Sequence, residues 1–256
     1  MKGFIKLGLV FALCAGVLGA DEFGEARKRY VTKYPSAKSA MEGSGVFVGI
    51  ELGLAQHTFQ IDLSKYGADK YDMKQAALAV GAKLGYKHFF VKWVGLRGYV
   101  DVNYVESRYT MPATAISKQS KGNINGFTND ISYGVNADIL LNFYNGETTF
   151  FGAFVGVGVG YQNAADNLWG NMLTSGMSNN GVSVTKLDTT RKMSGLYADA
   201  KVGLRVNVAK HHEMEFIATI PFTTISKEFS DDGGTTTVPA NYRQNYKFML
   251  GYNFVF

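Results

Sequence analysis

Eight segments of this chain alternate between large apolar residues and small or polar residues, and this period of two limits the fold more than any other feature. In the last segment, residues 246–256, every second side chain is large and apolar or aromatic. Successive side chains of a β-strand point to opposite faces, so each segment would have one apolar face and one mixed face. The sequence therefore predicts an all-β protein with strands within residues 45–55, 76–87, 94–104, 131–143, 151–161, 196–208, 214–222 and 246–256.

The connections between these segments alternate between long and short. This alternation is typical of a transmembrane up-and-down antiparallel β-barrel, with long loops outside the cell, short turns in the periplasm and both termini on the periplasmic side. A soluble sandwich gives no reason for it. We therefore predict one barrel of eight strands over residues 45–256, with extracellular loops near residues 56–72, 109–127, 162–193 and 226–241.

Aromatic residues gather near both ends of the predicted strands. Trp93 and Phe143 lie beside short connections, whereas Tyr161, Tyr242 and Tyr246 lie near long ones. Aromatic side chains favour the boundary between hydrocarbon and lipid headgroups. We therefore expect two girdles of aromatic side chains around the lipid-facing surface, with Tyr242 and Tyr246 both in the outer girdle.

The first 44 residues lack the alternation. Residues 1–20 combine two lysines, an apolar centre and small residues before Asp21, which is typical of a secretory signal peptide. Residues 21–44 are charged and mixed, and we expect a periplasmic leader there. Cys14, the only cysteine, lies inside the predicted signal, so we expect no disulfide in the folded protein. Beyond the signal, no apolar run approaches the ~20 residues of a membrane helix.

The net charge argues against a nucleic-acid partner. Without the two signal lysines the chain has 24 basic and 21 acidic residues, a formal net charge of 24 − 21 = +3. This balance is too small for a nucleic-acid-binding protein, and no basic aromatic motif of the RNA-binding kind is present. We expect no nucleic-acid partner.

Charged residues of both signs fall on the mixed face of the predicted strands. The interior of an eight-stranded barrel is about wide enough for its own side chains, and single charges there are costly. A nearly balanced set therefore predicts ion pairs that fill the lumen, with a narrow or gated water path as the alternative. The predicted interior polar network comprises Glu51, Lys83, Arg97, Asp101, Asp138, Asp199, Lys201, Arg205, Glu215 and Lys247.

No motif indicates an enzyme, a cofactor or a metal site. His57 lies at the start of the first predicted loop with no serine motif nearby, and His88, His211 and His212 fall in short turns. The glycine-rich run at residues 156–160 lies within a predicted strand and no helix follows it, unlike a nucleotide-binding loop. We predict no catalytic residue, no cofactor and no metal ligand. Catalytic residues need not be adjacent in sequence, so an enzyme stays open as an alternative.

The end of the chain, Gly251-Tyr-Asn-Phe-Val-Phe256, resembles the assembly signal of bacterial outer-membrane proteins. Together with the lysine-containing signal, it is also similar to the Helicobacter-type outer membrane protein family, whose larger members include porins and adhesins. The resemblance implies the outer membrane of a Gram-negative bacterium. It also implies recognition by the barrel-assembly machinery, with Tyr252, Phe254 and Phe256 as the recognised residues.

We therefore predict a non-enzymatic outer-membrane barrel that contributes to envelope structure and cell-surface interaction, including adhesion through its extracellular loops. The expected partners are outer-membrane lipid, lipopolysaccharide, the barrel-assembly machinery and a host or surface ligand. A small pore or gated channel is the first alternative. A lipid-modifying outer-membrane enzyme is the second.

Overall fold

The computed structural model describes residues 43–62, 70–112, 123–146, 149–167, 191–230 and 237–256. The predicted signal peptide, nearly all of the predicted leader and the central part of each predicted long loop lie outside these residues. No helix among the described residues is long and apolar enough to cross a membrane. The strands are β1 (Gly45–Asp62), β2 (Lys70–Val91), β3 (Val94–Pro112), β4 (Asn123–Asn145), β5 (Thr149–Asp166), β6 (Arg191–Val208), β7 (His212–Pro221), β8 (Ile225–Ser230) and β9 (Thr237–Val255).

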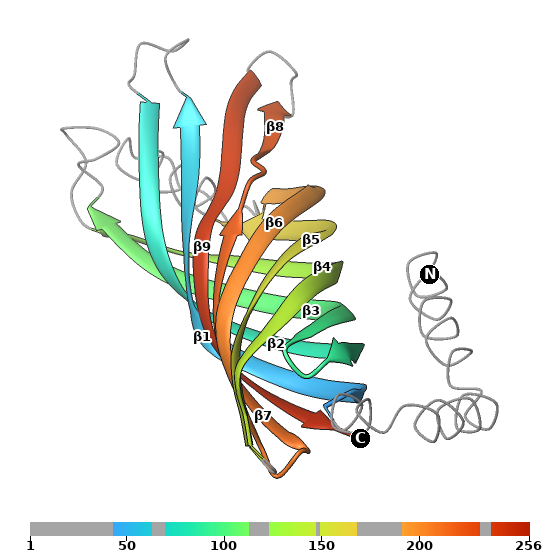
Figure 1. The fold of residues 1–256 in the computed structure, drawn as a ribbon. Helices are drawn as coiled ribbons and strands as arrows, with labels where there is room; N and C mark the ends of the chain where they lie inside the picture. The colour runs from blue at the N-terminus through green and yellow to red at the C-terminus, as the bar shows by residue number, and fades with distance from the viewer. Residues whose placement is uncertain (1–42, 63–69, 113–122, 147–148, 168–190, 231–236) are drawn as a thin grey trace, which may run out of the picture.

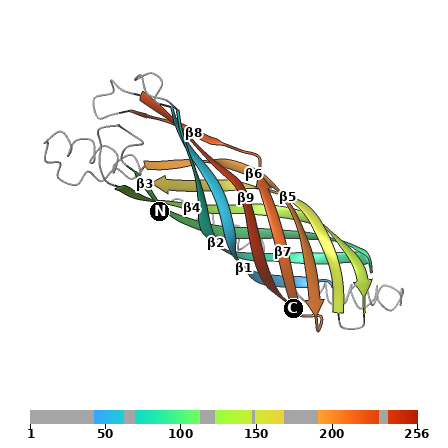
Figure 2. The ribbon, with the colours of Figure 1, turned by 90° about the vertical axis from the view of Figure 1, so that its left-hand side faces the viewer.

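The strands close into a single barrel (Figure 1). Each strand from β1 to β7 pairs antiparallel with the next, and β9 pairs with both β7 and β1, which joins the last strand to the first. Figure 2 shows the strands tilted together along the barrel. The predicted antiparallel barrel of eight strands is confirmed, with its seventh strand divided into β7 and β8, which both pair with β9.

Pro221 lies at the place where the seventh strand divides. Proline has no backbone N–H to donate to a ladder, and β7 ends at this residue. Pairing with β9 resumes at Ile225, whereas β6 pairs with β7 only from Asp199 onward. The backbone N–H of Phe222 donates to the carbonyl of Ala198 at 2.8 Å. Among the described residues, the wall between β6 and β8 therefore has a seam without a regular strand ladder.

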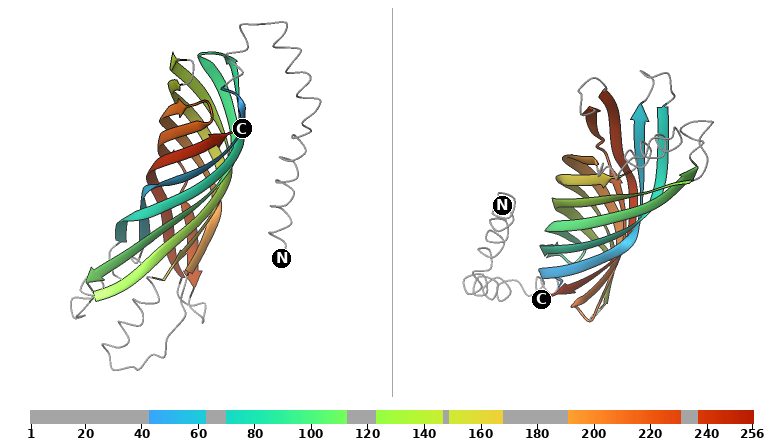
Figure 3. Two further views of the ribbon diagram at one scale, coloured as in Figure 1. Left: turned by 90° about the horizontal axis from the view of Figure 1, so that it is seen from below. Right: turned by 180° about the vertical axis from the view of Figure 1, so that it is seen from behind.

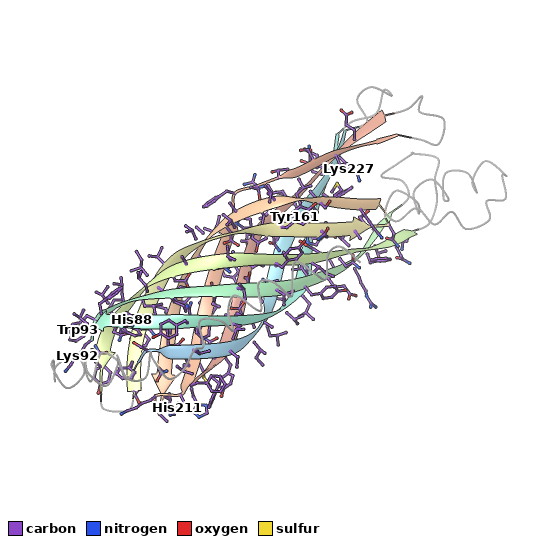
Figure 4. The ribbon with its side chains drawn as sticks, turned by 90° about the vertical axis from the view of Figure 1, so that its right-hand side faces the viewer. His88, Lys92, Trp93, Tyr161, His211 and Lys227 are labelled. Carbon is purple, nitrogen blue, oxygen red and sulfur yellow. The ribbon has the colours of Figure 1, made fainter. Side chains whose placement is uncertain are left out.

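The two ends of the barrel differ in their connections. Lys92 and Trp93 form the turn between β2 and β3, and Figure 4 shows both residues, with His211, at one end of the molecule. The carboxy-terminus lies at the same end, beside the start of β1, where Phe47 pairs with Val255 (Figure 3). We call this the turn end. The opposite end, where β1, β3 and β5 finish, is the loop end.

The barrel is apolar outside and polar inside. Outward side chains such as Leu196, Leu250 and Ile50 are 77%, 66% and 65% exposed, respectively. Inward side chains such as Arg97 and Asp138 are 2% and 1% exposed. A continuous apolar outer surface of this extent is that of a protein surrounded by lipid.

The paired strands extend beyond the apolar alternation. β1 and β2 stay paired as far as Asp62 and Lys70, inside the range 56–72 predicted as a loop. The ranges 109–127, 162–193 and 226–241 likewise contain parts of paired strands, including all of β8 except its first residue. Most outward side chains near the loop end are polar, such as Lys74, Arg108 and Ser226, so the hydropathy pattern stops there while the hydrogen-bonded ladder continues.

A β-bulge at Asn245 changes which side chains of β9 face the lumen. β1 residues Gln56 and His57 pair with Tyr246 and Gln244, so Asn245 has no partner in the register. A single extra residue reverses the alternation. Tyr246 is 39% exposed on the lipid side, but Tyr242 is 0% exposed in the lumen. The prediction that Tyr242 belongs to the outer girdle of aromatic side chains is wrong, because sequence alternation alone does not reveal the bulge.

Candidate functional site

The lumen is the candidate site, because it collects the charged side chains of the barrel. Nine of the ten residues in the predicted interior network are buried, and Glu51 is partly exposed but paired within the lumen. Each lies on an inward position of its strand, where the alternation of the sequence directs it. The contacts divide these residues into a group near the turn end and a group closer to the loop end.

Arg97 on β3 is the centre of the group near the turn end. Its Nε and Nη2 atoms donate to Asp138 Oδ2 at 2.8 and 2.6 Å, and its Nη1 donates to Glu215. Lys83 Nζ lies 2.5 Å from Glu215 Oε2 and 2.7 Å from Glu51 Oε1. Two cations and three carboxylates from five strands therefore form one connected set across the lumen.

Lys87 and Glu213 extend this set, although the sequence prediction omitted them. Lys87 Nζ lies 2.6 Å from Glu213 Oε2, and Arg205 Nη1 donates to the same oxygen at 2.9 Å. Arg97 Nη1 lies 3.6 Å from Glu213 Oε1, which joins the two parts. The signal was present, because Lys87 and Glu213 lie on the same faces as Lys83 and Glu215. We define the turn-side cluster as Glu51, Lys83, Lys87, Arg97, Asp138, Arg205, Glu213 and Glu215.

Aromatic rings pack around these cations. The guanidinium carbon of Arg97 lies 4.7 Å from the ring centroid of Phe154, 5.1 Å from Tyr99 and 5.6 Å from Phe47. Arg205 lies 5.0 Å from the Phe89 ring. Such contacts stabilise cations that have lost their hydration. With four cations and four carboxylates, the turn-side cluster is formally neutral, and all of its side chains except Glu51 are buried.

The second group lies closer to the loop end. Lys201 donates to Asn136 and to Asp101 Oδ2, the latter at 3.2 Å, and its Nζ lies 3.9 Å from Asp199 Oδ1. Lys247 is 4% exposed and interacts electrostatically with Asp101 and Asp199. The structure thus brings Asp101, Asp199, Lys201 and Lys247 together. Among the described residues none of them forms an ion pair with Arg97, but the Tyr99 ring lies close to both Lys201 and Arg97.

Glycines on β4 and β5 make room for Tyr197 in this part of the lumen. A Cβ atom on Gly160 would lie 2.6 Å from the Tyr197 ring, and one on Gly134 would also collide with this side chain. The inward glycines of β5 thus leave space that larger side chains of neighbouring strands occupy.

His57 belongs to this interior and not to a loop. The sequence placed it at the start of the first loop, but it lies within β1 and is 1% exposed. Its Nε2 donates to Gln75 Oε1 at 3.0 Å, and Ser107 Oγ donates to the same oxygen at 3.1 Å. Ser107 is therefore bonded to the amide and not to the imidazole. The prediction failed because the strand continues past the apolar alternation.

Close to His57, a hydrogen bond fixes the side chain of Tyr242. Its hydroxyl donates to Asp130 Oδ2 at 2.9 Å, and Gln162 donates to the same carboxylate. The Tyr242 ring centroid lies 5.5 Å from that of His57.

The described residues include no group of three or more His, Cys, Asp or Glu side chains placed to hold a metal ion.

The predicted assembly residues lie on the outer face of β9 or just beyond it. Tyr252 and Phe256 are 37% and 67% exposed, and the Phe254 and Phe256 ring centroids are 5.1 Å apart. His212 Nδ1 lies 2.7 Å from the Tyr252 hydroxyl, and His211 Nδ1 donates to the Val255 carbonyl at 2.7 Å. The sequence places both histidines in a short turn. Both are exposed, and they also join the last turn to the final strand.

Comparison with known protein families identifies the family of this chain. Residues 81–256, more than half of the chain, match the family described as Helicobacter outer membrane protein. A search of curated proteins finds no match.

Several solved structures resemble the fold. Neisserial surface protein A is 12% identical, with 83% of this chain and 98% of that protein covered and a TM-score of 0.40. OprG from Pseudomonas aeruginosa is 14% identical, with 83% and 96% covered and a TM-score of 0.49. The outer membrane protease OmpT from Escherichia coli is 10% identical, with 83% and 97% covered and a TM-score of 0.41. Such distant similarity concerns the fold alone. The family match, the closed barrel and its apolar outer surface agree, and the chain belongs to the Helicobacter outer membrane protein family as a β-barrel of the bacterial outer membrane.

Proposed function

We propose that this protein is a non-enzymatic outer-membrane barrel with a closed lumen, which contributes to envelope structure and to interactions at the cell surface. The observation that carries the proposal is the turn-side cluster. Arg97, Phe47, Phe154 and Leu140 are each no more than 2% exposed, and Arg97 holds carboxylates from two other strands. A lumen filled in this way favours a structural role over transport.

We place the turn end in the periplasm and the loop end outside the cell. Short turns on the periplasmic side and long connections on the outer side are the usual arrangement of such barrels. The predicted extracellular loops then supply the surface for a host or surface ligand, including adhesion. Outer-membrane lipid and lipopolysaccharide surround the barrel wall.

Loop exchange tests the surface role. A Gly-Ser linker of the same length would replace the central part of each predicted loop, namely residues 63–69, 113–122, 168–190 and 231–236. Adherence of the bacteria to a cultured epithelial layer should fall, while heat-modifiable folded barrel stays at the wild-type level. Unchanged adherence with every loop replaced would contradict the surface role.

The lipid-modifying enzyme has a direct test of its own. Lipid A from cells with and without the protein should carry the same acyl chains and phosphates by mass spectrometry. A difference that depends on the protein would overturn the non-enzymatic proposal.

We further propose that Tyr252, Phe254 and Phe256 are read by the barrel-assembly machinery. Replacing Phe256 with aspartate should lower the amount of folded barrel several-fold, because the change removes an exposed terminal aromatic and adds a charge at the membrane boundary. The measurement is heat-modifiable barrel in isolated outer membranes. The control Phe256→Tyr keeps the aromatic ring and should assemble normally. Normal assembly of the aspartate variant would refute this role.

A further inference from the structure

A row of polar side chains crosses three neighbouring strands on the outside of the barrel near the loop end. Thr58 on β1 pairs with Lys74 on β2 on one side and with Arg243 on β9 on the other. Figure 2 shows these three strands side by side. Neighbouring strands lie about 4.8 Å apart, so the Lys74 and Arg243 backbones are separated by roughly 10 Å. Two long basic side chains therefore flank one hydroxyl.

The bulge at Asn245 is what brings Arg243 to this row. Without the extra residue, Arg243 and Tyr246 would face opposite sides of β9, because their separation of three positions reverses the face. With it, both face outward while Tyr242 and Gln244 face the lumen. Bulges commonly re-aim side chains in this way. The irregularity of β9 thus places a guanidinium directly above a lipid-facing aromatic residue.

Among the residues that the structure describes, no acceptor is bonded to the basic side chains of this row. Lys74 and Arg243 are exposed, and neither forms an ion pair with another described residue. Asn245 Nδ2 donates to Thr58 Oγ1 at 2.8 Å, so the Thr58 hydroxyl keeps its own hydrogen for a further acceptor. The nearest carboxylate along β2 is Asp72, two residues further toward the loop end, where Gln60 donates to it at 2.7 Å.

The surface on the other side of the row is apolar. Leu54, Leu78, Tyr246 and Phe248 are 62%, 55%, 39% and 46% exposed. Two cations and a hydroxyl thus stand at the edge of a surface for hydrocarbon chains. Guanidinium and ammonium groups bind phosphate oxygens strongly, and the headgroup of a membrane lipid lies at this level.

We propose that Lys74, Thr58 and Arg243 bind the phosphate of a phosphorylated glycolipid of the outer leaflet, with its acyl chains against Leu54, Leu78, Tyr246 and Phe248. This site rests on the orientation proposed above, in which the loop end is outside the cell. The phosphate lies between the two basic side chains and accepts a hydrogen bond from Thr58. The apolar residues hold the same molecule by its chains, which makes the lipid and not free phosphate the ligand.

The test is binding of lipid A to the detergent-solubilised barrel, measured by native mass spectrometry. The double variant Lys74→Gln/Arg243→Gln should bind bisphosphorylated lipid A roughly 30-fold more weakly than the wild type. The matched control Lys92→Gln/Lys192→Gln removes two exposed cations elsewhere and should bind like the wild type. Dephosphorylated lipid A should bind the wild type and the Lys74→Gln/Arg243→Gln variant equally weakly.

Three results would overturn the proposal. They are equal lipid A binding by the double variant, equal binding of phosphorylated and dephosphorylated lipid A by the wild type, and inorganic phosphate that displaces lipid A at micromolar concentration. The orientation has a separate measurement. A cysteine at Ser226 should react with a membrane-impermeant maleimide on intact cells, and its protection would reject the orientation without altering the binding result.

Discussion

Replacing Arg97 with alanine is expected to destabilise the barrel by about 3–5 kcal/mol, because removal of one partner leaves buried charges uncompensated. Asp138 and Glu215 would lose their shared guanidinium, and both are at most 3% exposed. The three aromatic rings around Arg97 would also face a cavity. The measurement is the free energy of unfolding in guanidinium chloride, with the barrel in lipid vesicles.

Two controls separate charge from packing at this position. Arg97→Lys keeps the charge but loses the guanidinium geometry that donates to Asp138 and Glu215 at once, so it should cost less than alanine. Arg108→Ala removes an arginine whose side chain is 85% exposed beside Glu106, and its effect should stay within about 1 kcal/mol. A loss for Arg97→Ala no larger than that for Arg108→Ala would mean that the cluster does not hold the barrel together.

Replacing Leu250 with arginine is expected to cost about 2–4 kcal/mol, although the side chain is 66% exposed. Leu250 pairs with Leu52 on β1 and Phe216 on β7, both of which are also exposed and apolar. In a soluble protein, replacing an exposed leucine with a charged residue changes the free energy of unfolding little. Here the surrounding medium is hydrocarbon, and a charge in it is costly.

The matched control for this change is Ser226→Arg on β8. Ser226 is exposed near the loop end, beyond the apolar surface, so its substitution should change the free energy of unfolding by no more than about 1 kcal/mol. The same unfolding measurement compares the two variants. Equal effects at both positions would mean that Leu250 does not face lipid.

Alternation along the chain predicted the main architecture because a membrane barrel imposes it twice, through the pleat of each strand and through the lipid outside. It failed where one of these causes is missing. Beyond the hydrocarbon the outward residues are polar, so the pattern does not mark the strand ends or the place of His57 in β1. At Asn245 an extra residue shifts the register, so the sequence misplaces Tyr242.

The interior could be predicted as a set of inward residues but not as a set of contacts. Parity along each strand places Arg97, Lys201 and Glu215 in the lumen, and would have added Lys87 and Glu213. Which carboxylate each cation meets depends on strand tilt and on the order of strands around the barrel. For example, Lys83 on β2 reaches Glu215 on β7, 132 residues later in the chain.

Single-channel recording in planar bilayers tests the closed lumen most directly. The purified wild-type barrel should insert without producing stepwise conductance, because Arg97 and its partners fill the lumen near the turn end. Reproducible conductance steps from the wild type, with an amplitude that changes when Arg97 or Asp101 is neutralised, would contradict the closed barrel and establish a channel.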